Sequence, residues 1–385
     1  MEGRPVVMNF ATPPTWIFDT PDYSWNPDPN ARDVGYEKGQ SVKDMQTLVD
    51  YYVRLYTYYT KGGMTDEAGK FHKGYNYSFD WFEIFNEVEA EHGTSPADYT
   101  ARYDAIVTAL RAIAPHAKFL GLALGDHNDF AYYEYFLNSS NHAPGIPIDG
   151  ISYHNYVSSV STDPAQISQD FFGQADTFFE EVKQIQRIRA QLQPKAITMV
   201  NEIGCAYEAG PLNDMYWSLC AGYYAYMYGN LAALGVEVIG ESQMIGFVNG
   251  TYNTEWPCTS MVNWQTGAPN QRYWVLKMII DFLDTPGKEK AIVHTEMAGP
   301  SASPVYAQSF IKPGPAPNRV TLLVNKSPQA VSVQAVGSTG STLAWVDATT
   351  GENPYKTGLI KRDTIFLNGS ATAIIAWGEG QGLVQ

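Results

Sequence analysis

The spacing of apolar residues divides the chain into two parts. In roughly the first 285 residues, short β-rich apolar runs alternate with longer stretches whose apolar residues recur at helical spacing. Strands that alternate with helices indicate parallel βαβ units. The expected strands are Val6–Phe10, Trp81–Glu87, Lys118–Leu124, Ile148–His154, Ala196–Glu202 and Val236–Ser242. The expected helices are Ser41–Thr60, Ala97–Ala114, Asp129–Leu137, Ser168–Gln191, Tyr216–Leu234 and Tyr273–Leu283.

Polar residues close several of these strands. They are Asn86-Glu87, Asp126-His127, His154, Asn201-Glu202 and Glu241-Ser242. A (β/α)8 barrel of the TIM type carries its active site on the face formed by the carboxyl ends of its strands. We therefore predict a barrel domain over residues 1–287. A full barrel has eight strands and six are found, so we expect the first two βα units to be absent from this chain. The loops 19–35 and 257–269 are less favoured places for the two remaining strands.

After Pro286-Gly287 the helical spacing ends. Seven short β-rich runs follow, separated by Gly, Pro, Asn and Ser. This pattern predicts a small all-β sandwich over residues 288–385. The runs are Ala291–Glu296, Val305–Ile311, Arg319–Val324, Ala330–Ala335, Thr342–Asp347, Thr364–Leu367 and Ala371–Trp377.

Composition excludes several classes of partner. With 44% hydrophobic and 17% charged residues, the chain is that of a folded globular protein. A formal net charge of −15 argues against binding to nucleic acid or to an anionic membrane. No apolar run approaches the roughly 20 residues that span a bilayer. Aromatic residues make up 14%, which suits sugar binding and an aromatic core equally well.

The cysteines and sequons bear on metal binding and on localisation. Cys205, Cys220 and Cys258 form no cluster with zinc spacing, so we expect no structural metal. One disulfide with a free thiol and three buried thiols both remain open. The first residues do not form a signal peptide. Five Asn-x-Ser/Thr sequons nevertheless favour a secreted or lysosomal protein; they begin at Asn76, Asn138, Asn249, Asn325 and Asn368.

Two strand ends carry the strongest chemical signal. The segments 81–87 and 197–204 are each an apolar strand that reaches an Asn-Glu pair. A glutamate is poorly placed for packing at the end of a buried strand. Two carboxylates on one barrel rim, one protonated and one ionised, are what glycoside hydrolysis requires. The alternative is a pair of solvated or salt-bridged glutamates on the rim.

These residues resemble the clan A retaining glycoside hydrolases, most closely family 39, which includes β-xylosidases and α-L-iduronidases. The run 81–89 is similar to the Phe-Glu-Ile-Trp-Asn-Glu-Pro segment of that family and differs from it at Phe85 and Val88. The resemblance implies that Glu87 is the general acid/base and that Asn86 binds the 2-hydroxyl of the sugar.

Two further segments extend the resemblance. Residues 200–204 are similar to the segment that carries the nucleophile, which implies that Glu202 has this role. Residues 152–156 match a His-x-Tyr signature, which places His154 and Tyr156 at the site. Family 39 also carries a β-sandwich beside its barrel. The implied mechanism is double displacement, with Tyr156 or His154 donating a hydrogen bond to Glu202.

Other candidates come from position alone. Glu241 ends the last strand of the barrel and is a third carboxylate that could bind substrate. Trp256 and Trp264 lie in long loops on the active face and could form aromatic subsites, as could Trp16. Glu83 shares a strand face with Glu87 and is expected to pair with an Arg or with another polar rim group. Lys61 and Arg272 are the basic residues that could hold a substrate carboxylate.

The sequence therefore predicts a retaining glycoside hydrolase that removes terminal sugars. Its substrate is a carbohydrate, and this chemistry needs no metal and no other cofactor. One alternative is a transglycosylase with the same two glutamates. The other is a non-catalytic carbohydrate-binding protein, favoured if the first strands of the barrel are truly missing. The sugar and its anomer are left open.

Overall fold

The computed structural model describes residues 6–11, 17–18, 42–91, 93–207, 214–242, 244–245, 260–263, 266–283, 290–298, 303–314 and 318–378. The helices are α1 (Met45–Thr60), α2 (Pro96–Ile113), α3 (Phe130–Phe136), α4 (Pro164–Leu192), α5 (Asp214–Ala233) and α6 (Gln271–Leu283). The strands up to residue 241 are β1 (Val7–Phe10), β2 (Gly63–Thr65), β3 (Phe71–Lys73), β4 (Trp81–Ile84), β5 (Lys118–Leu124), β6 (Gly150–Ser159), β7 (Ile197–Tyr207) and β8 (Val238–Glu241). The later strands are β9 (Ala291–Val293), β10 (Val305–Ile311), β11 (Arg319–Asn325), β12 (Val331–Gln334), β13 (Thr342–Val346), β14 (Lys356–Leu359), β15 (Thr364–Leu367) and β16 (Thr372–Ala376).

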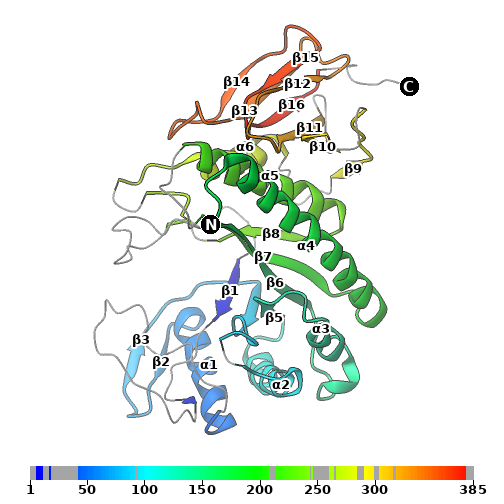
Figure 1. Ribbon diagram of the computed structural model, residues 1–385. Helices are drawn as coiled ribbons and strands as arrows, with labels where there is room; N and C mark the ends of the chain where they lie inside the picture. Colours follow the sequence, from blue (N-terminus) through cyan, green and yellow to red (C-terminus); the bar gives the residue numbers. More distant parts are fainter. Residues whose placement is uncertain are drawn as a thin grey trace. The chain divides into compact units, whose positions relative to one another are not determined.

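The first part of the chain is an incomplete α/β barrel, as predicted. Six strands form one sheet in the order β1-β4-β5-β6-β7-β8, and the pairs β1/β4, β4/β5 and β5/β6 are parallel (Figure 1). Strand neighbours follow chain order, which is the arrangement of repeated βα units. The sheet curls into a half-barrel. Loop 19–35 lies outside the described residues, and the described part of loop 257–269 holds only single-residue bridges at Val262.

The antiparallel region that follows agrees with the predicted β-rich runs. One sheet has the order β14-β13-β16-β11-β10-β9, and β12 pairs with β15 in a second sheet. The pattern missed β14 and the β2/β3 hairpin, because each of these three strands holds only one large apolar residue. The predicted domain boundary at residue 287 lies among residues outside the described part, so it stays a prediction.

Contacts divide the chain into two compact units. The first comprises Met1–Asn155 and Glu181–Asn201. Within it α1, α2 and α3 cover one face of β1, β4 and β5 (Figure 1). The Tyr52 hydroxyl donates to the carbonyl of Phe10 at 3.1 Å, and the Tyr99 hydroxyl donates to the carbonyl of Ile84 at 3.0 Å. Burial of each such aromatic ring contributes about 1.5–3 kcal/mol, which fixes the strand ends on which the polar residues sit.

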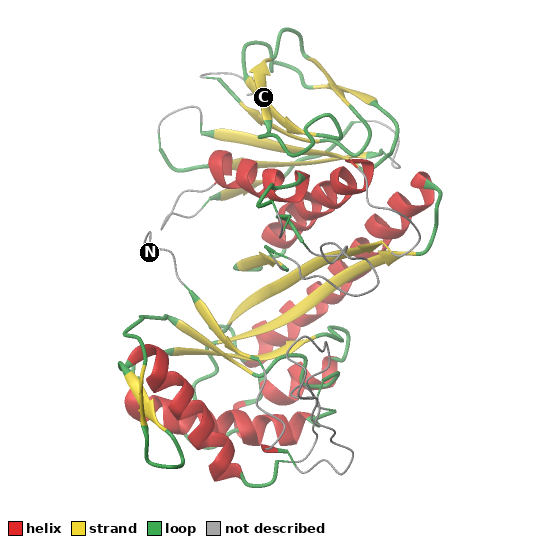
Figure 2. Cartoon of the chain, turned by 90° about the vertical axis from the view of Figure 1, so that its left-hand side faces the viewer, coloured by secondary structure: helices red, strands yellow, loops and turns green. Residues whose placement is uncertain are grey.

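The second unit comprises Tyr156–Glu180 and Glu202–Gln385. Within it α5 and α6 pack against the antiparallel sheet (Figure 2). Gly229 of α5 allows this close approach, because a Cβ there would lie 2.4 Å from the hydroxyl oxygen of Tyr306. Tyr223 and Tyr224 of α5 are fully buried, as expected for a helix that is apolar on all sides.

A disulfide joins Cys205, near the end of β7, to Cys220 of α5. Of the two arrangements left open by the sequence, the structure therefore shows a disulfide for these two cysteines and not two buried thiols. Cys258 lies outside the described residues. None of the helices in the described part of the chain is long and apolar enough to cross a membrane.

Candidate active site

The backbone after β4 is turned so that Glu87 can reach the rim of the sheet. Phe85 and Glu87 have φ angles of 66° and 38°, in the left-handed region that side chains other than glycine rarely adopt. The buried ring of Phe85 packs against Tyr52 and Tyr99, with centroids 5.6 and 6.4 Å away. The Glu87 amide donates to the carbonyl of Ala123 at 2.9 Å. Strained backbone held by tight packing is typical of functional sites.

Strand β5 ends in a matching irregularity. Its register with β6 shifts between Leu122 and Leu124, and Leu122 and Ala123 also have positive φ angles. Gly125 follows, and a Cβ at this position would lie 2.9 Å from the carboxyl carbon of Glu87. Glycine therefore leaves the space that the Glu87 carboxylate occupies.

A histidine holds the Glu87 carboxylate. His154 of β6 is fully buried, and its Nδ1 lies 2.9 Å from Glu87 Oε1. Glu87 itself keeps about a quarter of its side chain exposed, at 27%. A partly exposed carboxyl group beside an imidazole can exchange a proton with solvent and with a bound substrate.

The Glu202 carboxylate has its own hydrogen-bond donor. The hydroxyl of Tyr156, two residues after His154 on β6, donates to Glu202 Oε2 at 2.6 Å. The Oγ of Ser242 lies 2.7 Å from the same hydroxyl. Because a phenol carries one proton, Ser242 can donate to the Tyr156 oxygen while Tyr156 donates to Glu202. Of the two donors expected for Glu202, the structure shows Tyr156 in that position.

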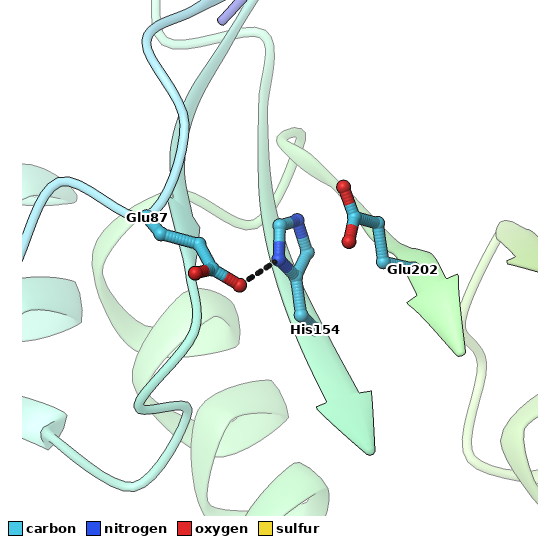
Figure 3. A group of neighbouring side chains, drawn as sticks. All are labelled: Glu87, His154 and Glu202. Atoms are coloured by element: carbon cyan, nitrogen blue, oxygen red, sulfur yellow. Dashed lines mark hydrogen bonds and ion pairs between the residues drawn. The ribbon is translucent and has the colours of Figure 1, made fainter. Parts of the chain in front are cut away.

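Glu87, His154 and Glu202 form one group of side chains. One oxygen or ring nitrogen of each lies within 4.8 Å of the others, and Figure 3 shows the imidazole beside the two carboxyl groups. His154 and Tyr156 lie two residues apart on β6, so they share a face of that strand. Two carboxylates and an imidazole could also hold a divalent cation.

Asn86 and Glu89 flank Glu87. Asn86 Nδ2 donates to Glu91 Oε1 at 3.1 Å, so in this structure its amide is turned toward Glu91. Glu89 Oε1 accepts from the amide of Asp126 at 2.5 Å. Burial raises the pKa of the Glu89 carboxyl, and the negative charge of Glu87 adds to that shift. His127, which follows Asp126, lies 2.8 Å from Glu181.

Glu241 ends β8 as predicted, in a buried environment. Its Oε2 is buried, and no residue in the described part of the chain forms a hydrogen bond with it. Burial raises the pKa of the Glu241 carboxyl well above its usual value, and the positive charge of Arg272 opposes this shift. Arg272 is fully buried, with its guanidinium 4.1 Å from the ring centroid of Trp217. A substrate-binding role for Glu241 stays a prediction.

The remaining sequence candidates lie elsewhere. Trp16, Trp256 and Trp264 fall outside the described residues. Lys61 lines a groove of about 650 Å³ with Trp81 and Lys118, the first residues of β4 and β5. Glu87 follows the opposite, carboxyl end of β4, and the assignment of Lys61 to a substrate carboxylate stays a prediction.

The sequence did not reveal what three residues near the site do. Ser242 was named only as a polar residue that closes a strand, whereas it forms a hydrogen bond with Tyr156. Gly125 leaves space for Glu87, but a single glycine carries no periodic signal. Asn201 was seen only as a neighbour of Glu202, whereas its amide donates to both oxygens of Glu83. The position of Asn201 immediately before Glu202 was the one sequence feature that could have pointed to its role.

Comparison with known proteins reveals similarity in fold only. No protein-family model matches the sequence, and no curated protein is similar to it. Among solved structures, a glucosidase from Croceicoccus marinus superposes with a TM-score of 0.54 at 12% identity, over 88% of this chain and 77% of that chain. An α-L-arabinofuranosidase from Thermotoga maritima gives 0.55 at 14% identity, over 85% of this chain and 72% of that chain. A family 44 endoglucanase from Clostridium acetobutylium gives 0.52 at 12% identity, over 92% and 73%. Over most of its length the chain therefore shares its fold with these three solved enzymes.

Proposed function

We propose that this protein is a retaining glycoside hydrolase in which Glu87 is the general acid/base and Glu202 the nucleophile. The observation that carries the proposal is the group formed by Glu87, His154 and Glu202, with atoms within 4.8 Å of one another. Carboxylate oxygens this close fit retaining enzymes, whose carboxyl groups stand about 5–5.5 Å apart, better than inverting enzymes, which leave room for a water.

The reaction proceeds in two displacements. Glu87 donates a proton to the departing glycosidic oxygen while Glu202 attacks the anomeric carbon to form a glycosyl ester. Glu87 then removes a proton from the water that hydrolyses this ester. Tyr156 orients the attacking oxygen of Glu202 through its 2.6 Å hydrogen bond, and His154 fixes the Glu87 carboxyl.

The substrate class is a glycoside with a terminal sugar, as in family 39, which the motifs of segments 81–89 and 200–204 resemble most closely. A secreted or lysosomal location is part of the proposal. The Cys205–Cys220 disulfide favours an oxidising compartment. Among the sequons, Asn76 and Asn368 are exposed, whereas Asn325 is fully buried and unsuited to modification in the folded protein.

Covalent trapping tests the two roles. A panel of nitrophenyl glycosides identifies a substrate, and the matching 2-deoxy-2-fluoro glycoside should label Glu202, as read by peptide mass spectrometry. Glu202→Ala should lose hydrolysis and labelling. Glu87→Ala should lose hydrolysis of poor leaving groups, but it should retain the first displacement for leaving groups that need no proton.

Glu134→Ala is the matched control, because Glu134 is an exposed glutamate on α3 and should be replaceable without loss. Equal activity in the wild type and in the Glu87 and Glu202 variants would contradict the proposal.

A further inference from the structure

The carboxylate of Glu83 on β4 is buried and contacts neighbours of the proposed catalytic residues. Glu83 lies on β4 of the barrel sheet and is fully buried, although its side chain can carry a charge. Its carboxylate accepts hydrogen bonds from Asn9 of β1, Ser152 of β6 and Asn201 of β7. Asn201 Nδ2 lies 2.9 and 2.8 Å from the two carboxylate oxygens. A buried carboxylate is tolerated when several donors surround it, and here three other strands supply them.

The donors to Glu83 are neighbours of the proposed catalytic groups. Asn201 immediately precedes Glu202 in the chain. Ser152 is two residues before His154, so both side chains share one face of β6.

Ser152 also connects to the backbone that carries Glu87. Its Oγ accepts from the amide of Ala123 at 3.2 Å, and the carbonyl of Ala123 accepts from the amide of Glu87 at 2.9 Å. Each path from Glu83 to a proposed catalytic side chain therefore runs through one or two residues.

We propose that Glu83 is a positioning residue, a buried acceptor that sets β6 and β7 so that Glu87 and Glu202 face one sugar ring. This inference rests on the proposed function. Replacing a buried polar network by apolar residues is often neutral or stabilising for a fold. Stability alone therefore does not call for a carboxylate here, whereas alignment of reacting groups does, because a misplacement of about 1 Å costs about 10²-fold in rate.

Two substitutions test the role of Glu83. Glu83→Gln keeps the shape but replaces one acceptor oxygen by an NH2 donor, which then faces the donors of Asn9, Ser152 or Asn201. Asn201→Ala keeps the Glu83 carboxylate and removes the two hydrogen bonds from β7. We expect both variants to lower kcat by about 10²-fold with KM little changed, and to slow the labelling of Glu202 by the fluoro glycoside by a similar factor.

Asn325→Ala is the matched control. Asn325 is fully buried in the antiparallel region, and its amide donates two hydrogen bonds, to the carbonyls of Gln329 and Asn368. Its side chain also accepts from the amide of Ser327, so its replacement removes three hydrogen bonds against two for Asn201→Ala, and none of them involves a residue of the proposed site. We expect a lower melting temperature with wild-type kcat and wild-type labelling.

The outcomes distinguish the positioning role of Glu83 from the proposed function. Wild-type kcat and labelling in Glu83→Gln and Asn201→Ala, with only the melting temperature lowered, would overturn the positioning role and leave the proposed function standing. If Glu83→Gln does not fold, kcat and labelling of the milder variant Asn201→Ala test the positioning role. A wild-type protein that hydrolyses no glycoside and is not labelled would overturn the proposed function and this inference with it.

Discussion

At the scale of single residues, the candidate site depends on backbone that most side chains avoid. Phe85, Glu87, Leu122 and Ala123 all have positive φ angles, and they lie where β4 and β5 end. The identities of Glu87 and Glu202 could be predicted, because a charge that closes an apolar strand stands out in a sequence. The hydrogen bond from Tyr156 to Glu202 was expected from the resemblance. The contacts of Glu87 with His154 and Gly125 could not be predicted, since they depend on turns that follow no periodic pattern.

Gly125 provides a direct test of how tightly Glu87 is held. Gly125→Ala places a Cβ 2.9 Å from the Glu87 carboxyl carbon, which must then move. We expect kcat to fall by about 10²-fold, measured on the substrate found with nitrophenyl glycosides. Gly173→Ala on α4 is the control, because a Cβ there meets nothing within 4 Å and alanine favours helix. Unchanged kcat in Gly125→Ala would show that the Glu87 carboxyl is not confined by β5.

Tyr156→Phe tests the hydrogen bond to Glu202. The variant keeps the ring and removes the 2.6 Å donor. Hydrogen bonds to charged groups contribute about 1.5–3 kcal/mol, so kcat/KM should fall roughly 10- to 100-fold. Steady-state kinetics give the answer, with Tyr135→Phe on α3 as a tyrosine control outside the site. Equal kcat/KM in wild type and Tyr156→Phe would contradict the orienting role.

Glu89 predicts a pH dependence of stability. Burial raises its pKa above the ordinary 4.5, so the unfolded chain releases this proton first as the pH rises. The wild type therefore loses stability as the pH rises through the window from 4.5 to the raised folded value. Glu89→Gln keeps an acceptor for the Asp126 amide and removes this loss.

We expect Glu89→Gln and wild type to melt at similar temperatures near about pH 4, and the variant to melt higher near about pH 7. Thermal unfolding followed by circular dichroism measures both. Glu134→Gln, at an exposed site, should show no such pH-dependent gap. A gap of equal size at both pH values would argue against a buried, raised-pKa carboxyl at position 89.

At the scale of elements, the long strands and helices followed from apolar periodicity. The bounds of β5, β10 and β15 agree with the predicted runs. β6 and β7 extend beyond their predicted ends at His154 and Glu202, to Ser159 and Tyr207. The sequence pattern therefore did not place Tyr156 and Cys205 within strands.

The disulfide ties one of these extensions to a helix. Cys205 and Cys220 are separated by 15 residues, and a crosslink over a loop of that length contributes about 3 kcal/mol to stability. Cys220→Ala should lower the free energy of unfolding in urea by about that amount. Cys205→Ala should have the same effect, and combining the two should add little. An unchanged free energy of unfolding in the single variants would contradict a bond between these residues.

At the scale of the whole molecule, this chain shares its fold, but little of its sequence, with several solved enzymes. Solved glycoside-cleaving enzymes superpose on most of this chain with 12–14% identity. The alternation of strands and helices predicted that architecture, because it depends on the order of elements and not on particular residues. The sugar could not be predicted, since neither the ring nor the anomer can be read from two carboxylates, and Trp256 and Trp264, the expected aromatic subsites, lie outside the described residues.

The stereochemical course of hydrolysis tests the roles proposed for Glu87 and Glu202. If Glu87 and Glu202 act on one sugar from atoms within 4.8 Å of one another, the first sugar released has the anomeric configuration of the substrate. Proton NMR during the first minutes of hydrolysis resolves the two anomers before they equilibrate. We predict retention. Release of the opposite anomer would contradict the account, because inversion needs a water between carboxylates about 6.5–9.5 Å apart.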